Sequence, residues 1–145
     1  MKYPIGIQDF ERIIEDGYVY LDKTGLVYDL VHNGTIYFLC RPRRFGKVVA
    51  RIYLKCYFEG KKELFKGLAI DKLEKDWKQY PVLHLSFGGQ NFVEPYALDK
   101  VLEEFVAMAE RIYGREELAE TLGSRFKAVL GNAHKKTGMR AVVLI

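Results

Sequence analysis

The stretch from Ile36 to Phe58 constrains the fold of this chain more than any other. Five apolar residues, 36–40, predict a buried strand, and residues 49–58 have the composition and spacing of a helix. Between them lies segment 41–48, with the sequence RPRRFGKV. A strand, a loop containing Gly-Lys and a helix follow one another in this order in a phosphate-binding loop. The stretch therefore predicts an α/β fold with an anion site where the helix begins.

This loop departs from the pattern G-x-x-x-x-G-K-[ST] at two positions. Gly46 and Lys47 are in place, but Arg41 stands at the first glycine and Val48 at the Ser or Thr. In the pattern, backbone N–H groups surround the phosphates, the lysine reaches the β- and γ-phosphates, and the hydroxyl binds Mg²⁺. Because Val48 has no hydroxyl, we expect an anion to bind, Mg²⁺ to bind poorly and hydrolysis to be inefficient.

The expected nucleotide- or phosphate-binding residues are consecutive in the chain: Arg43, Arg44, Phe45, Gly46, Lys47 and Val48. Lys47 is interpreted either as a phosphate ligand or as an exposed lysine after a turn, and its place between strand and helix favours the first. Guanidinium groups match phosphate geometry, yet Arg43 and Arg44 are equally well explained as solvated side chains. The backbone N–H of Val48 can still point at phosphate, because a helix N-terminus carries partial positive charge.

Charge is distributed unevenly along the chain. The net charge is only +4, but no acidic residue lies between Asp29 and Glu59. The same segment carries six basic residues, Arg41, Arg43, Arg44, Lys47, Arg51 and Lys55. It should attract a phosphate-bearing ligand. A rival interpretation is a non-catalytic interaction module, in which these residues bind a nucleic-acid backbone or an acidic partner.

Length and residue types limit the remaining classes of protein. The 145 residues, 49% of them hydrophobic, fit one domain over 1–145. We interpret Cys40 and Cys56 as buried reduced thiols and His84 as a core residue. His32 and His134 fall near helix ends and have no Cys or His partner at metal-ligand spacing. We therefore assign no metal ligand and no catalytic residue. With no apolar run of ~20 residues and no apolar signal core, we expect a cytoplasmic protein.

Apolar spacing predicts further elements on both sides of this stretch. Helices are predicted at 7–16, from after Thr24 to a stop at Asn33-Gly34, at 71–79 and at 116–136, with Thr24 as an N-cap and Gly17 as a stop. Another helix has Pro95 in its first turn and an inward stripe of Leu98, Val101, Leu102, Phe105, Met108, Ala109 and Ile112. Segments 81–87 and 139–145 are expected to be strands. Strands separated by helices predict an α/β sandwich with a mostly parallel sheet.

Five blocks of sequence, in this order, resemble the AAA-ATPase-like family common in gut bacteria. They are Pro4–Phe10 (PIGIQDF), Tyr20–Thr24 (YLDKT), Arg41–Lys47 (RPRRFGK), Tyr57–Gly60 (YFEG) and Leu64–Leu68 (LFKGL). The resemblance covers essentially the whole chain. It implies a P-loop NTPase-like three-layer sandwich, with ATP as the ligand and ATPase activity. It also implies a following PD-(D/E)XK nuclease-like domain in full-length members, and through it a nucleic-acid partner.

The chain departs from this family at the positions that handle magnesium. The family loop continues with Ser where this chain has Val48, and its third strand runs into an Asp-Glu pair that would follow Ile145. The resemblance thus implies an N-terminal part with a degenerate Walker A loop, no competent hydrolysis and a sheet incomplete at its C-terminal end. In the family fold, the strand carrying the loop neighbours a fourth strand, which would also follow Ile145. Since open parallel edges associate readily, we expect self-association or strand exchange.

Overall fold

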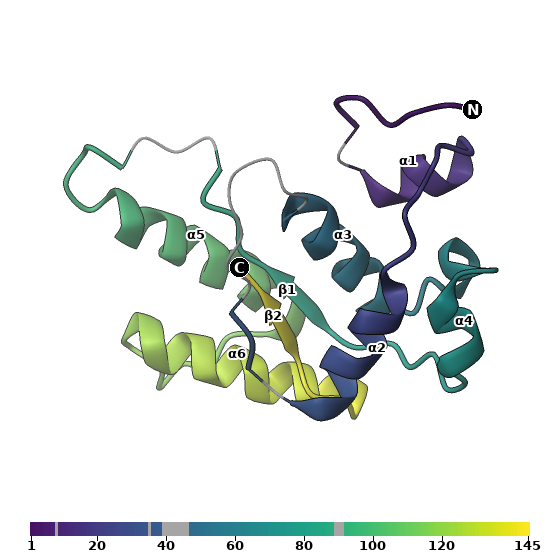
Figure 1. Cartoon of the computed structure of the whole chain (residues 1–145). Coiled ribbons are helices and arrows are strands. Elements are labelled where there is room, and N and C mark those ends of the chain that lie inside the picture. The colour runs from purple at the N-terminus through teal and green to yellow at the C-terminus, as the bar shows by residue number, and fades with distance from the viewer. Residues whose placement is uncertain (8, 35, 39–46, 89–91) are drawn as a thin grey trace. The chain divides into compact units, whose positions relative to one another are not determined.

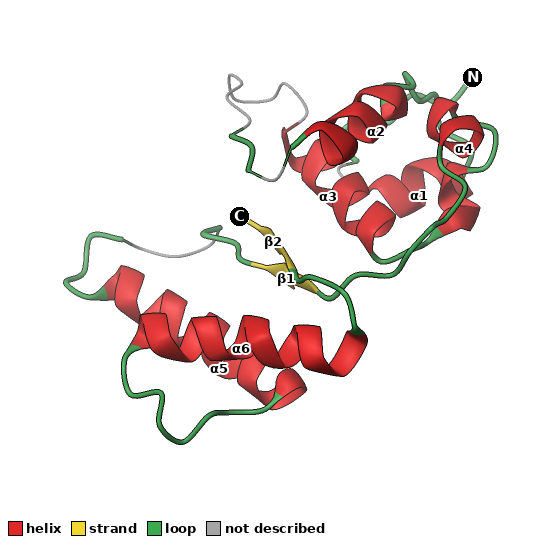
Figure 2. Ribbon diagram, turned by 90° about the horizontal axis from the view of Figure 1, so that it is seen from below, coloured by secondary structure: helices red, strands yellow, loops and turns green. Residues whose placement is uncertain are grey.

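Helices dominate the part of the chain that this computed structural model describes, which is residues 1–7, 9–34, 36–38, 47–88 and 92–145 (Figure 1; Figure 2). Two strands accompany them and pair in parallel. Contacts divide the chain into two compact units, Met1–Gln79 and Tyr80–Ile145. Helices and a parallel strand pair agree with the α/β class expected from the sequence.

The first unit is built from short helices joined by tight turns. They are α1 Phe10–Glu15, α2 Thr24–Asn33, α3 Lys47–Phe58, the 3-10 helix η1 Lys62–Phe65, and α4 Ala69–Leu73. The helix predicted at 7–16 forms over a shorter range, because the Asp9 side chain accepts a hydrogen bond from the Glu11 N–H at 3.0 Å and caps it. Gly17, with φ of +67°, ends it as predicted.

An aromatic core holds these helices together. Phe10 and Phe65 are fully buried with ring centroids 5.3 Å apart, and Tyr57 packs edge-on against Phe65 at 6.4 Å. The single tryptophan, Trp77, lies 5.2 Å from the Phe65 ring. Three of these four rings come from within or beside the blocks that carry the family resemblance, so those blocks build the core of this unit.

The helix predicted at 71–79 is wrong in position. Helix α4 covers Ala69–Leu73, and Glu74 is its C-cap. It begins early because Asp22 accepts a hydrogen bond from the Ala69 N–H at 2.7 Å and Thr24 accepts one from the Ile70 N–H at 3.1 Å. Bonds from residues more than forty positions away therefore fix its start, and local periodicity does not report them.

The second unit places two long helices on a strand pair. Its elements are β1 Val82–His84, α5 Ala97–Tyr113, α6 Leu122–Thr137 and β2 Val142–Leu144. The strands pair in parallel with Leu83 opposite Val143, and helices α5 and α6 pack against each other (Figure 2). Leu83, Ala109 and Val129 form the buried core, against which Val143 packs. The strands predicted at 81–87 and 139–145 are confirmed over these shorter ranges.

Both long helices differ from their predicted bounds for local reasons. Helix α6 begins at Leu122, not near 116, because Thr121 and Ser124 form a reciprocal capping box. Helix α5 begins at Ala97, after Tyr96 with φ of +63°, so Pro95 lies before the helix and not in its first turn.

The predicted inward stripe of α5 is only partly correct. Val101 and Ala109 are buried as predicted, and Val106 is buried as well. The side chains of Leu98, Met108 and Ile112 are instead exposed, at 49%, 63% and 53%. The apolar side of α5 is thus wider than the surface that α6 and the strands cover.

The strand predicted at 36–40 is not found where the structure describes it. Residues 36–38 carry no strand, and Ile36 and Phe38 are each 92% exposed. A parallel strand needs a paired neighbour, and the described sheet contains only β1 and β2. Cys40 and the rest of this predicted strand lie outside the described residues.

The interpretation of His84 as a core residue is also wrong. It lies at the end of β1 with its side chain on the exposed side, whereas Leu83 and Leu85 are buried. Because side chains alternate along a strand, the buried positions are the odd-numbered ones and His84 falls on the other face.

Candidate functional site

The residues predicted to bind phosphate lie around the start of helix α3. Lys47 and Val48 are its first two residues. In a phosphate-binding loop the helix also begins at this lysine. Arg43, Arg44, Phe45 and Gly46 lie outside the described residues, as does Arg41.

Helix α3 has a charge pattern that suits an anion at its N-terminal end. Its first turn contains no acidic residue, and basic residues recur at intervals of four in its sequence, at Lys47, Arg51 and Lys55. Its first N–H groups have no partner within the helix, and they carry the positive end of its dipole. Lys55 is neutralised by Glu59, whose carboxylate lies 3.7 Å from its Nζ. The basic residue nearest the other end of the helix is thus already paired with an acidic one.

Arg51, one turn into α3, contributes an unusual polar group. Its Nε atom is buried, and no hydrogen-bond partner for it occurs in the described part of the chain. An unpaired buried donor of this kind costs stability. The sequence identified Arg51 as one of the six basic residues of the segment, but it did not predict that the Nε atom of Arg51 is buried.

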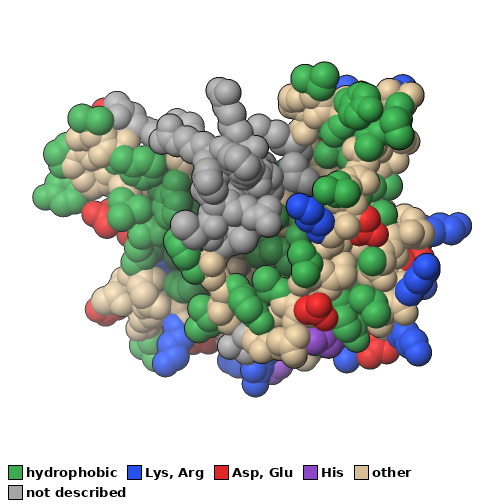
Figure 3. Space-filling model, viewed as in Figure 1, with side chains coloured by type: hydrophobic (Ala, Val, Ile, Leu, Met, Phe, Trp, Pro, Cys, Tyr) green, Lys and Arg blue, Asp and Glu red, His purple; other side chains and the backbone are tan. Residues whose placement is uncertain are grey.

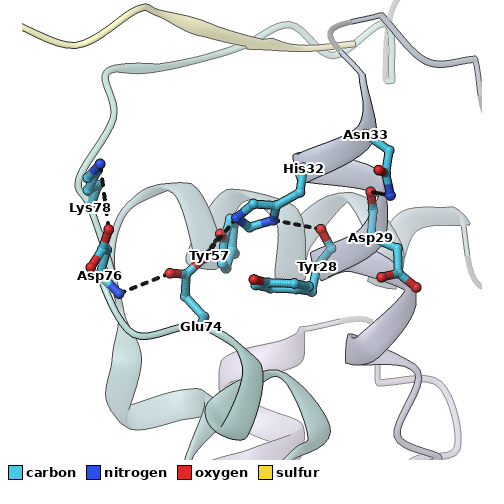
Figure 4. A network of polar contacts seen from close by, with 8 residues as sticks. All are labelled: Tyr28, Asp29, His32, Asn33, Tyr57, Glu74, Asp76 and Lys78. Atoms are coloured by element: carbon cyan, nitrogen blue, oxygen red, sulfur yellow. Dashed lines mark hydrogen bonds and ion pairs between the residues drawn. The ribbon is translucent and has the colours of Figure 1, made fainter.

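A second polar cluster connects α2, α3 and the turn after α4 (Figure 4). Glu74 is at its centre: Tyr57 Oη donates a hydrogen bond to Glu74 Oε2 at 2.5 Å, and the Asp76 N–H donates to Oε1 at 3.0 Å. His32 stacks on Tyr28 and places Nε2 3.9 Å from Glu74 Oε2. No sequence pattern indicates this cluster, because its members are brought together only by tertiary folding.

The second cluster has a structural role and is not a reactive site. His32 Nδ1 lies 2.8 Å from the Tyr28 carbonyl oxygen, which only accepts, so Nδ1 carries the proton. Burial acts to raise the pKa of Glu74, but the hydrogen bonds from Tyr57 and Asp76 and the nearby His32 outweigh it and hold the pKa below its usual value. Both carboxylate oxygens are occupied, so Glu74 serves to anchor the chain after α4.

The block Asp22-Lys23-Thr24 has a structural role in this fold. Asp22 Oδ1 accepts hydrogen bonds from the Thr24 N–H at 2.9 Å and from its hydroxyl at 2.7 Å. The other oxygen, Asp22 Oδ2, accepts a hydrogen bond from the Ala69 N–H, and the Thr24 hydroxyl accepts one from the Ile70 N–H. Thr24 is therefore the first helical residue and not the predicted N-cap. We call Asp22, Thr24, Ala69 and Ile70 the α2–α4 clamp.

Cys56 confirms the sequence interpretation of a buried reduced thiol. It is 1% exposed, and its Sγ donates to Glu11 Oε1 at 3.5 Å. Burial, reinforced by the Glu11 carboxylate, raises the pKa of Cys56 to about 12. Lys61 forms an ion pair with the same carboxylate. A thiol in this environment is a weak nucleophile.

Among the described residues, no group of three or more His, Cys, Asp or Glu side chains is arranged to hold a metal ion. None of the described helices is both long enough and apolar enough to cross a bilayer.

The helix-strand architecture and the basic start of α3 are those of an α/β protein with a candidate phosphate site. A family model described as predicted AAA-ATPase matches residues 4–145, and the chain belongs to this AAA-ATPase-like family. An uncharacterized protein from the vnfD 5′ region of Azotobacter chroococcum mcd 1 is 40% identical over 146 residues. The match covers 99% of this chain and 28% of that relative, so the chain spans little more than a quarter of its length. No solved structure matches the chain.

Proposed function

We propose that this chain binds the phosphates of a nucleotide, with ATP as the candidate ligand, at the N-terminal end of α3. Lys47 would hold the β- and γ-phosphates, and Gly46 would allow the backbone to approach them closely. The observation that carries the proposal is the family match across residues 4–145, together with a helix that begins at Lys47. The proposed full architecture is a P-loop NTPase-like sandwich.

Binding is expected to be weak and nearly independent of magnesium. Val48 occupies the position of the metal-binding hydroxyl, so the chain offers the phosphates a lysine and backbone N–H groups but no ligand for Mg²⁺ there. Phosphoryl transfer depends on positioning and on neutralising charge with the metal. We therefore propose binding without competent hydrolysis and assign no catalytic residue.

A titration calorimetry experiment tests this proposal directly. ATP is titrated into the chain with Mg²⁺ and again with EDTA, and the same is done with Lys47→Ala. Lys55→Ala is the matched control, because it removes a lysine from the same helix at a position already paired with Glu59. Binding that survives EDTA and Lys55→Ala but is lost in Lys47→Ala supports the proposal. No heat from ATP at any concentration, or equal loss in both variants, contradicts it.

The alternative is that the basic segment binds a nucleic-acid backbone or an acidic protein. Affinity for a polyphosphate backbone falls steeply as salt rises, because counterions are released on binding. Affinity for one nucleotide should depend chiefly on Lys47. A steep salt dependence that Lys47→Ala and Lys55→Ala reduce alike would favour the alternative.

The variant Val48→Thr separates the metal argument from the phosphate argument. Threonine has nearly the same shape as valine and restores the hydroxyl of the phosphate-loop pattern. We expect ATP to bind several-fold more tightly with Mg²⁺ than with EDTA in this variant, and equally in both for the unchanged chain. If Mg²⁺ already strengthens binding to the unchanged chain as much as to Val48→Thr, the account of the missing metal ligand is wrong.

A further inference from the structure

Segment 121–145, which contains α6 and β2, has no acidic residue. Its basic residues are Arg125, Lys127, Lys135, Lys136 and Arg140. All but Arg140 belong to α6, so this helix carries positive charge and no Asp or Glu of its own to neutralise it. Basic side chains reach the surface at several places on the side of the molecule drawn in Figure 3. The positive charge of α6 makes its surface a candidate for binding an anionic partner.

Two of the basic residues of α6 have structural roles within the second unit. Arg125 is buried and donates hydrogen bonds of 2.9 and 2.8 Å to the carboxylate of Glu110. Lys136 Nζ donates a hydrogen bond to the Ile112 carbonyl at 3.0 Å. Both interactions join α6 to α5, so packing of the two helices explains these two residues.

The other two lysines lie on an exposed side of α6 that is made of small and basic residues. Since successive residues of a helix are about 100° apart, one third of its circumference holds the exposed residues Gly123, Ser124, Lys127, Gly131, His134 and Lys135. We call these residues the α6 face. In the part of the chain that the structure describes, no acidic group forms an ion pair with Lys127 or Lys135. Their positive charges are therefore available to a ligand.

The composition of the α6 face favours one class of anionic partner. The face has no aromatic side chain on which a base could stack, which disfavours single-stranded nucleic acid. It has no large apolar side chain to enter a lipid layer, which disfavours a membrane surface. It offers two lysines about 12 Å apart along the helix axis, with Gly131 between them. A rigid phosphate backbone can approach such a surface closely and contact both lysines.

We propose that the α6 face binds the phosphate backbone of double-stranded nucleic acid without reading its sequence. Lys127 and Lys135 each contact a phosphate, and Gly131 lets the backbone pass between them. Phosphate contacts of this kind position a protein on a duplex and carry no sequence information. The inference concerns α6 alone and does not depend on nucleotide binding at α3. With so few contacts, we expect the Kd of sequence-independent binding, roughly 1–100 µM at physiological salt.

Fluorescence anisotropy with a short labelled DNA duplex of random sequence tests the proposal. The double variant Lys127→Gln/Lys135→Gln should bind about ten-fold more weakly at low salt, and the slope of log K against log salt should become shallower by about 2. The matched control is Lys72→Gln/Lys100→Gln, which removes the same charge from exposed lysines outside the α6 face and should have a much smaller effect. No binding by the unchanged chain, or equal weakening by the two double variants, overturns the proposal.

The variant Gly131→Leu separates close approach from charge and from folding. Leucine is a better helix former than glycine, and a Cβ at this position would meet no atom within 4 Å, so the melting temperature should rise. The affinity for the duplex should nevertheless fall several-fold, because the new side chain stands between the two lysines. Unchanged or tighter binding by Gly131→Leu overturns the proposal. A polyglutamate peptide that competes as well as unlabelled duplex also overturns it, because the face would then accept any acidic chain.

Discussion

Replacing Thr24 by valine should destabilise the first unit more than replacing it by serine. Thr24 is fully buried, and its hydroxyl makes two hydrogen bonds of the α2–α4 clamp, donating to Asp22 and accepting from the Ile70 N–H. Valine keeps the shape but removes both bonds. Serine keeps the hydroxyl and removes one methyl group. The three residues differ little in helix propensity, so the comparison isolates the hydroxyl.

The expected magnitudes follow from the surroundings of each group. In Thr24→Val the buried Ile70 N–H loses its acceptor, which costs about 1–3 kcal/mol. Asp22 loses a hydroxyl donor but is exposed enough for water to replace it, so this loss adds only about 1 kcal/mol. The sum is about 2–4 kcal/mol. Thr24→Ser should cost about 1 kcal/mol, the value of one buried methyl group.

Urea unfolding followed by Trp77 fluorescence measures this difference in the correct unit. Trp77 is the only tryptophan and packs on the Tyr57 and Phe65 rings, so its emission reports the core that contains Thr24. Thr24→Val should lower the free energy of unfolding clearly more than Thr24→Ser, without a change in the slope on urea. If Thr24→Ser is equally or more destabilising, packing and not the clamp gives Thr24 its importance, and the argument fails.

Three further results are expected. The pKa of Glu74 is lowered in the folded chain, so its contribution to stability is present above its unfolded pKa of about 4.3 and is lost as pH falls through the folded value. Urea midpoints measured from pH 7 to 3 should therefore fall less steeply in Glu74→Gln than in the unchanged chain. The Cys56 thiol, with its pKa raised to about 12, should resist iodoacetamide at pH 8 until urea unfolds the chain, and early labelling of its peptide in mass spectrometry would contradict its burial. Glu110→Gln should lower the melting temperature more than Glu103→Gln does. Glu110 accepts hydrogen bonds of 2.9 and 2.8 Å from Arg125, whereas the side chain of Glu103 is 60% exposed. Equal shifts of the melting temperature, followed by circular dichroism, would refute this.

Local patterns were sufficient to predict the elements whose boundaries are set within a few residues. Helix α2 ends at Asn33 before Gly34, and α3 ends at Phe58, because stop signals and apolar spacing lie in the elements themselves. Helix α4 was misplaced because Asp22 fixes it from 47 residues away. Periodicity likewise identified the apolar side of α5, but it carries no information on how much of that side a neighbour covers. Met108 shows the difference, since it lies on the predicted stripe and is exposed.

The candidate site divides in the same way. A helix close after Lys47 was predictable, because a loop motif and the helix that follows it are adjacent in the chain, although α3 begins at Lys47 itself and not at Val49. The Glu74 cluster was not, because Tyr57 and His32 reach it from two other helices. Nothing local to Glu74 distinguishes it from the other acidic residues of a charged segment.

The family blocks themselves separate into those that build the fold and the one on which function depends. Phe10, Thr24, Tyr57 and Phe65 come from four different blocks, and each is buried in the first unit. Their presence is explained by packing and by the α2–α4 clamp, so these four blocks establish the fold without indicating a reaction. The nucleotide proposal therefore depends on the remaining block, Arg41–Lys47, and on the residue that follows it. For this reason Lys47→Ala and Val48→Thr, which leave the buried residues of the other blocks untouched, are the changes that decide whether an AAA-ATPase-like fold here still binds a nucleotide.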